Sequence, residues 1–383
     1  MKAKIISFVC TMLLTATAAM AQGNFSMKGT IKNAEGQTIN LMYDFGPNPT
    51  TISTTVKNGK FQFNGTLDKP YQKAVIYIGS LQDRNNKYVR FALEPGNLTT
   101  DIDGNNFKTA TVHGGKTQEE SNAFEASLSE INKQSEELED AYYKANTEEE
   151  RNAIKEKMEP LSTQLREARL HFIKTHPDSY LSPEFLRFFM SRMSFEELKS
   201  VYDNFTDNVK KHGDCAEIVK EINTLERVQP GRQAPDFTAN DINGKPFTMS
   251  SLRGKGGIID FWASWCVPCR KSNPHMKSLY DKYHDKGLEM VYVSDDDSKE
   301  DAWRKAVEKD GLVGDGFHHV LRGLKWDRSK GIDGIDHTND ISDKYAIHFL
   351  PTKYLIDRKG NIVCKIDEGE DEKLDQLLEN LMK

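Results

Sequence analysis

The chain has 383 residues, which is more than one typical domain, so its length predicts two or three folded units. Hydrophobic residues make up 37% of the chain and charged residues 29%, a balance that suits a soluble protein with an ample core. The formal net charge of −6 has the wrong sign for a phosphate-binding surface, so we expect no nucleic acid among the partners.

The first residues carry the pattern of an export signal. Two lysines form a short basic start, an apolar run from 5 to 14 follows them, and "AMA" at 19–21 has the small–any–small form that signal peptidase accepts. We therefore expect residues 1–21 to be a signal peptide, cleaved between Ala21 and Gln22, and the mature protein to lie in the periplasm. A buried N-terminal helix is the alternative.

Residues 22–115 are rich in short runs of β-branched and aromatic residues, such as "KFQFNGTL" and "KAVIYIG". Glycine, asparagine and proline separate these runs, as at Asn58-Gly59. The close spacing predicts an antiparallel β module of the sandwich or barrel type. Because no cluster of cysteine, histidine or acidic residues is visible in this stretch, we expect it to be a binding or spacer module.

From 116 to 228 the apolar periodicity becomes helical, and Ile131 and Leu138 lie on one such stripe. Thr147 and Glu150 have the spacing of a capping box at the start of a further helix. The stripe fits an antiparallel helical hairpin packed on a neighbouring domain. It also fits a seam through which the chain forms a homo-oligomer.

A linker, "QPGRQAP" at 229–235, precedes a region in which strands and helices alternate. "GGIIDFWAS" and "LEMVYVS" are typical of buried strands, and "TKYLIDRKGNIVCKID" is typical of a hairpin. This order predicts a domain over 229–383 with an α/β fold, in which helices cover both faces of a mixed sheet. Residues 323–340 lack the pattern and are interpreted as an inserted loop.

Two of the five cysteines, Cys266 and Cys269, form a Cys-x-x-Cys motif. The motif follows a predicted buried strand and opens a predicted helix, with Pro268 in the first turn. Unpaired amides and the positive dipole end of that helix are expected to lower the pKa of an exposed Cys266 sulfur. The Cys269 sulfur would lie within bonding reach, so the position favours a redox pair.

Three other uses of the motif have less support. A zinc site needs two further ligands, whereas Cys215 and Cys364 are single and far apart in the sequence. Haem attachment would need a histidine where Arg270 stands. A purely structural clip would close so short a loop that it would restrain little chain entropy.

Two weaker signals have simple interpretations. The three aspartates at 295–297 could suggest calcium, but Asp297 with Glu300 has capping-box form, which favours a helix cap. Cys215 could suggest a nucleophile, but we expect it to be a solvent-exposed thiol in a loop.

Three motifs in the right order carry a resemblance to a known family. "IIDFWASWCVPCR" resembles the active-site strand, turn and helix of thioredoxin. "GRQAPDFTANDINGKPFTMSSLRGK" and "FLPTKYLIDRKGNIV" resemble segments of the exported TlpA/ResA-type thiol–disulfide oxidoreductases. The match covers about residues 230–383. The β-rich stretch and its following helices resemble the uncharacterised region that often precedes such domains.

The resemblance implies a thioredoxin-like domain and a role for each matching residue. Cys266 would be the attacking thiolate and Cys269 the resolving thiol. Asp260 matches the buried acid that helps to move the proton of the resolving cysteine, and a carboxyl in an apolar strand has a raised pKa. A strand-end aspartate bonded to backbone is the alternative interpretation of Asp260.

The resemblance also assigns supporting residues. Pro351 matches a cis-proline that faces the cysteines, where it would expose the Leu350 backbone for pairing with a substrate peptide and deny a metal access to the sulfurs. Trp265 would shield the thiolate on one side, and Trp262 would pack beneath it.

The sequence therefore predicts an exported thiol–disulfide oxidoreductase that reduces protein disulfides. Its partners would be disulfide-containing client proteins and a membrane or soluble electron donor, and no cofactor or metal would be needed. A peroxiredoxin-like peroxidase is one alternative, although Ala263 stands where it would need threonine or serine. A non-enzymatic envelope binding or assembly protein with a vestigial redox domain is the other.

Overall fold

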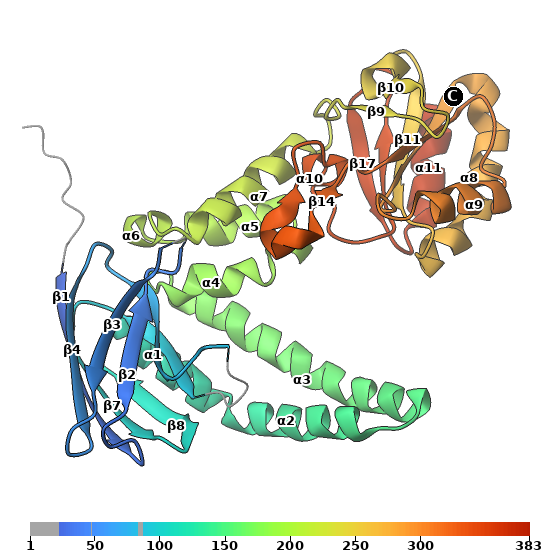
Figure 1. The fold of residues 1–383 in the computed structure, drawn as a ribbon. Helices are drawn as coiled ribbons and strands as arrows, with labels where there is room; N and C mark the ends of the chain where they lie inside the picture. The colour runs from blue at the N-terminus through green and yellow to red at the C-terminus, as the bar shows by residue number, and fades with distance from the viewer. Residues whose placement is uncertain (1–22, 47, 83–86) are drawn as a thin grey trace, which may run out of the picture. The chain divides into compact units, whose positions relative to one another are not determined.

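The computed structural model describes residues 23–46, 48–82 and 87–383, so the predicted signal peptide lies outside the described residues (Figure 1). Its internal contacts divide the chain into two compact units, Met1–Ser182 and Pro183–Lys383. The domain boundaries expected at 116 and 229 stay predictions. Within the described residues, no helix combines the length and the apolar character needed to cross a membrane.

Two four-stranded sheets form the β-rich part of the first unit, as far as it is described, with strand orders β4-β1-β7-β8 and β3-β2-β5-β6. The strands are β1 (Gly23–Lys32), β2 (Thr38–Tyr43), β3 (Thr50–Thr55), β4 (Lys60–Leu67), β5 (Gln72–Ile78), β6 (Tyr88–Leu93), β7 (Gly96–Asp103) and β8 (Asn106–His113). One hydrophobic cluster draws residues from both sheets, for example Met27 and Leu41. The predicted antiparallel β module is confirmed, with β1 and β7 as a parallel pair inside it.

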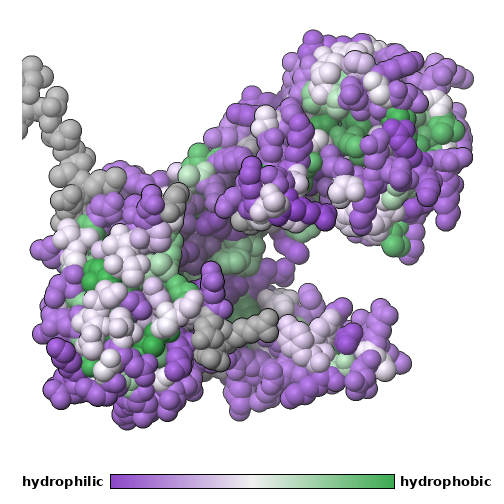
Figure 2. All heavy atoms as spheres, in the orientation of Figure 1, coloured by the Kyte–Doolittle hydropathy of each residue, from purple (hydrophilic) through white to green (hydrophobic). Residues whose placement is uncertain are grey.

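Three helices follow in the first unit: α1 (Lys116–Ser127), α2 (Ser129–Lys144) and α3 (Glu148–Thr175). The predicted capping box is present, because Thr147 accepts from the Glu150 amide and the Glu150 side chain accepts from the Thr147 amide. Helices α2 and α3 form a hairpin (Figure 1). Hydrophilic residues cover most of this hairpin on the face that Figure 2 shows, in agreement with its many charges.

The second unit begins within α4 (Leu181–Arg187) and continues with further helices that the sequence assigned to the middle region: η1 (Met190–Arg192), α5 (Phe195–Asp203), α6 (Asp207–Lys210) and α7 (Cys215–Arg227). The expectation for Cys215 is wrong. It is the first residue of α7 and is buried, its Sγ donates to the Val209 carbonyl (3.3 Å), and burial raises its pKa to about 11.

A five-stranded mixed sheet is the core of the second unit, in the order β13-β12-β11-β16-β17. Its strands are β11 (Gly256–Trp262), β12 (Leu288–Ser294), β13 (Phe317–Leu321), β16 (Thr352–Ile356) and β17 (Ile362–Asp367). The first three are parallel, and β16 and β17 are antiparallel to their neighbours. This arrangement follows from the alternating order of elements and the final hairpin in the sequence.

Helices cover both faces of this sheet, which confirms the predicted fold class (Figure 1). One core cluster contains residues of α8 (Val267–Tyr283), α9 (Glu300–Lys309) and α11 (Asp371–Leu381). A second cluster, on the other face, contains Ile341 of α10 (Ile341–Lys344) together with Val228, which follows α7. Shorter elements complete the unit: β9 (Thr238–Asn240), β10 (Pro246–Thr248), η2 (Met249–Leu252) and η3 (His284–Lys286).

The predicted insertion at 323–340 contains structure that its sequence did not indicate. It holds β14 (Lys325–Trp326), η4 (Arg328–Gly334) and β15 (Ile335–Asp336), and the two strands pair with each other. Two hydrogen bonds of 2.7 Å join the Arg322 guanidinium to the buried Asp340 carboxylate and close the base of the insertion. A loop closed in this way can vary without disturbing the sheet.

Candidate active site

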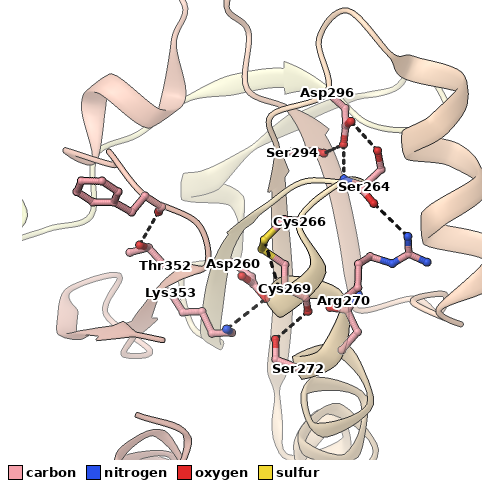
Figure 3. Close-up of a disulfide and its surroundings, with 12 residues drawn as sticks. Asp260, Ser264, Cys266, Cys269, Arg270, Ser272, Ser294, Asp296, Thr352 and Lys353 are labelled. Atoms are coloured by element: carbon pink, nitrogen blue, oxygen red, sulfur yellow. Dashed lines mark hydrogen bonds and ion pairs between the residues drawn. A yellow bond between two sulfur atoms is a disulfide. The ribbon is translucent and has the colours of Figure 1, made fainter. Parts of the chain in front are cut away.

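Cys266 and Cys269 form a disulfide where β11 ends and α8 begins (Figure 3). Cys266 is the N-cap residue of α8, and its Sγ accepts a hydrogen bond from the Cys269 amide (3.3 Å). The sulfur therefore sits at the positive end of the helix, as the sequence predicts. The expectation that the Cys266 sulfur is exposed is wrong for the oxidised pair. Cys266 is 4% exposed and packs in a core cluster with Trp262.

Asp260 lies on β11, which is buried along its whole length. Side chains alternate along a strand, so Asp260 faces the same side as Trp262, which is the side of the cluster that holds both cysteines. Burial raises the pKa of Asp260 to about 6, and its Oδ1 has no hydrogen-bond partner among the described residues. The alternative interpretation, a carboxylate bonded to backbone, therefore finds no support.

Lys353 is a candidate site residue that the sequence analysis missed. It lies directly opposite Asp260 in the β11–β16 pairing, and its Nζ is 3.9 Å from Asp260 Oδ2, with both side chains almost fully buried (Figure 3). The ammonium charge pulls the Asp260 pKa down against the effect of burial. A lysine inside the otherwise apolar "TKYLI" run was the available signal, since a buried lysine requires a partner.

Hydrogen bonds to Asp296 brace the turn that carries the cysteines. The Asp296 carboxylate accepts from the Ser264 amide, the Ser264 hydroxyl and the Ser294 hydroxyl, each at 2.7 Å (Figure 3). Ser264 is two residues before Cys266, so Asp296 fixes the turn from the end of the neighbouring strand.

The structure also corrects the prediction that Asp297 caps a helix. The N-cap residue of α9 is Lys299, without a side-chain cap, and Asp297 instead accepts from the Gly323 amide (2.7 Å). Helix α9 begins at Glu300, which is later than a capping box from Asp297 to Glu300 requires. The Asp297 carboxylate therefore accepts from a loop amide instead of a helix amide. Burial raises the Asp297 pKa to about 6.

The remaining predicted residues surround the disulfide. The Leu350–Pro351 peptide bond is cis, and β11 pairs with β16 up to Phe261 and Thr352, so this bond lies beside the end of the strand that leads to Cys266. Pro268 is in the first turn of α8. The supporting tryptophans differ in environment: Trp262 is fully buried, and Trp265 is 56% exposed.

Three comparisons with known proteins bear on this site. The model of the AhpC/TSA family matches residues 230–365, and that of a domain of unknown function, DUF4369, matches residues 25–121. The thiol–disulfide oxidoreductase ResA of Bacillus cereus is 34% identical over 157 residues, which cover 41% of this chain and 80% of the relative. The chain belongs to the ResA-like thiol–disulfide oxidoreductases.

Membership makes the protein an oxidoreductase with a thioredoxin-like domain, and it confirms the resemblance seen in the three motifs. ResA of Bacillus subtilis (strain 168) is 32% identical over 141 residues, which cover 36% of this chain and 67% of that relative. A solved thioredoxin domain of a thiol–disulfide oxidoreductase from Bacteroides vulgatus is 30% identical, with a TM-score of 0.32, and covers 39% of this chain and 98% of that one.

One group of side chains in the described part of this ResA-like chain has the spacing of metal ligands. Potential ligand atoms of His337, Asp340 and Asp343 lie within 4.8 Å of one another. Asp340 is already engaged by Arg322 through both oxygens, and Lys220 pairs with Asp343. These ion pairs compete with a cation for the same carboxylates, so the group is better explained as a salt-bridge network.

Proposed function

We propose that this protein is an exported enzyme that reduces protein disulfides through a dithiol–disulfide cycle of Cys266 and Cys269. The observation that carries the proposal is the pair of sulfurs bonded at the N-terminus of α8, on the side of the sheet where the buried Asp260 lies. The direction of the cycle rests on a resemblance, because the Val-Pro dipeptide between the cysteines is similar to that of reductant-type members of the family. Export follows from the signal-like residues 1–21.

The reaction begins with the reduced pair. The Cys266 thiolate attacks one sulfur of a client disulfide, a mixed disulfide forms, and the first client thiolate leaves. Cys269 then loses its proton to the Asp260 carboxylate and attacks the Cys266 sulfur, which releases the second client thiolate. The client gains two electrons, and the protein returns to the disulfide.

Partners on both sides of the cycle follow from this chemistry. The clients are proteins with an accessible disulfide, and the oxidised pair must be reduced again by a dithiol donor, membrane-bound or soluble, because an exported protein works in an oxidising compartment. A homo-oligomer formed through the helical region at 116–228 remains a separate proposal from the sequence. The thiol and disulfide steps use no cofactor.

Insulin reduction tests the proposal against its rivals. With dithiothreitol as the donor, the full chain is expected to accelerate insulin precipitation, and it is expected to consume hydrogen peroxide slowly because Ala263 replaces the hydroxyl residue that a peroxidase needs. Rapid peroxide turnover without insulin reduction would favour the peroxiredoxin-like function. The absence of both activities would favour a binding or assembly protein.

A further inference from the structure

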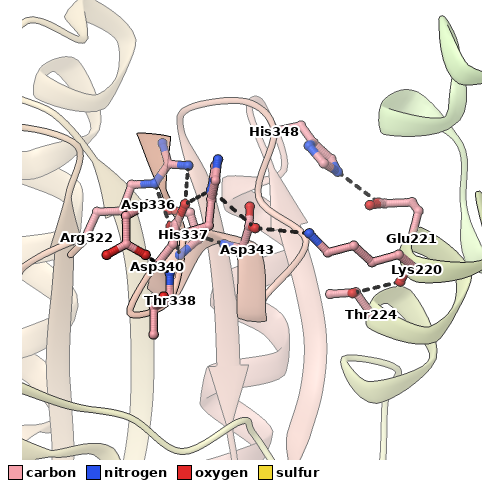
Figure 4. A network of polar contacts seen from close by, with 11 residues as sticks. Lys220, Glu221, Thr224, Arg322, Asp336, His337, Thr338, Asp340, Asp343 and His348 are labelled. Atoms are coloured by element: carbon pink, nitrogen blue, oxygen red, sulfur yellow. Dashed lines mark hydrogen bonds and ion pairs between the residues drawn. The ribbon is translucent and has the colours of Figure 1, made fainter. Parts of the chain in front are cut away.

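The helical segment that opens the second unit contacts the loop that leads to Pro351. His348 Nε2 is 2.8 Å from Glu221 Oε1 of α7, and Lys220 Nζ, also of α7, is 3.4 Å from Asp343 Oδ2 (Figure 4). Val228, just after α7, packs in the same core cluster as Ile347. This segment precedes the residues that match the AhpC/TSA family, so it adds contacts beyond the matched domain.

A third contact brings a positive charge to this loop. The Arg192 guanidinium of η1 lies over the Phe349 ring, with its central carbon 4.9 Å from the ring centre. Phe349 is two residues before Pro351, and the pairing of Phe261 with Thr352 places this loop at the end of β11 that leads to Cys266. Arg192 therefore lies at the rim of the proposed active site.

The charge of Arg192 is not matched by an ion pair, in contrast to several charged groups near the site. Glu221 pairs with His348, Asp343 pairs with Lys220, and Arg270 pairs with Asp310. In the described part of the chain, no carboxylate forms an ion pair with Arg192. A guanidinium that lies over an aromatic ring keeps its N–H donors free for a carboxylate.

Apolar side chains are exposed at Phe349, which Arg192 contacts, and next to Cys266. Phe349 is 47% exposed, and Trp265 and Val267, which flank Cys266, are 56% and 63% exposed. Exposed aromatic groups next to an unmatched arginine are typical of protein-binding surfaces. The apolar groups fit any polypeptide, whereas the arginine distinguishes acidic segments from neutral or basic ones.

We propose that Arg192, held over Phe349, selects clients that carry an acidic residue close to the disulfide to be reduced. The client chain would lie over Phe349, with a carboxylate accepting hydrogen bonds from the Arg192 guanidinium. The inference rests on the proposed function, because it concerns the clients of the same Cys266–Cys269 pair. It assigns the helical segment before the thioredoxin-like domain a part in client choice.

Two peptides test this proposal. Each is a short peptide closed by one disulfide, with either glutamate or glutamine beside a cysteine. The full-length protein turns over each peptide at low and high salt with dithiothreitol as the donor, and the rate without protein is subtracted. We expect kcat/KM to be about three- to fivefold higher for the glutamate peptide, as for an exposed ion pair. The difference should lie in KM, and most of this difference should disappear at high salt. The Arg192→Gln variant should reduce both peptides equally.

A matched control separates the loss of this charge from a general loss of positive charge. Arg90 also lies over an aromatic ring, that of Tyr88 at 5.2 Å, but in the β-rich part of the first unit, and Arg90→Gln should keep the preference for glutamate. Equal rates for both peptides with the wild type, or an undiminished preference in Arg192→Gln, would overturn the inference while peptide reduction itself upheld the proposed function. If neither peptide were reduced, both proposals would fall.

Discussion

Replacing Cys266 by serine is expected to abolish insulin reduction. A hydroxyl does not ionise at neutral pH, so it can neither attack a disulfide nor form the mixed disulfide. We expect a loss of at least about a thousandfold, since removing a covalent nucleophile acts on that scale or above. The measurement is the initial rate of insulin precipitation with dithiothreitol, corrected for the rate without protein.

Cys364 provides the matched control for this variant. It lies on β17 in the same unit, is partly buried and is a free thiol. The Cys364→Ser variant should therefore keep the wild-type rate, because the same chemical change is made away from the disulfide. Equal rates for Cys266→Ser and wild type would show that another thiol performs the reduction.

Replacing Asp260 by asparagine is expected to slow the resolving step by about a hundredfold, the lower end of the range for general-base catalysis. Asp260 accepts the Cys269 proton only when it is ionised, so the wild-type rate should rise with pH through the Asp260 pKa of about 6. The asparagine side chain does not ionise in this pH range, so the rising limb of the pH–rate profile should disappear in the variant. The rate is followed by quenching the mixed disulfide and measuring its decay by mass spectrometry.

The Lys353→Met variant distinguishes a proton acceptor from a merely structural carboxylate. The ammonium of Lys353 lowers the pKa of Asp260, so its removal should raise that pKa and move the limb to higher pH. The plateau rate above the shifted limb should remain near that of the wild type. A profile identical in wild type, Asp260→Asn and Lys353→Met would exclude Asp260 from proton transfer.

Features set by local sequence could be predicted, and the thioredoxin-like domain shows why. The strand before Cys266, the proline in the following turn and the apolar period of α8 are all encoded within a few residues of one another. The proline-threonine motif likewise carries its own local signature. These short-range patterns sufficed for the mixed sheet and for the cysteine pair at the helix N-terminus.

Features that depend on pairing between distant segments could not be predicted. Lys353 lies opposite Asp260 because of the register between β11 and β16, which are separated by about ninety residues. Neither strand's sequence alone determines that register. Asp297 was predicted to cap a helix, but it accepts from the Gly323 amide, and Asp296 accepts from Ser264, so both partners come from loops elsewhere in the sequence. Cys215 looked exposed because the preceding turn gives no sign that Val209 covers its sulfur.

Trapping the mixed disulfide tests the central claim most directly. A Cys269→Ala variant of the full chain lacks the resolving thiol, so after reduction and mixing with a peptide disulfide it should retain one peptide per chain. Peptide mapping by mass spectrometry should place that peptide on Cys266. An adduct on Cys215 or Cys364 instead, or no adduct at all, would contradict the assignment of Cys266 as the attacking group.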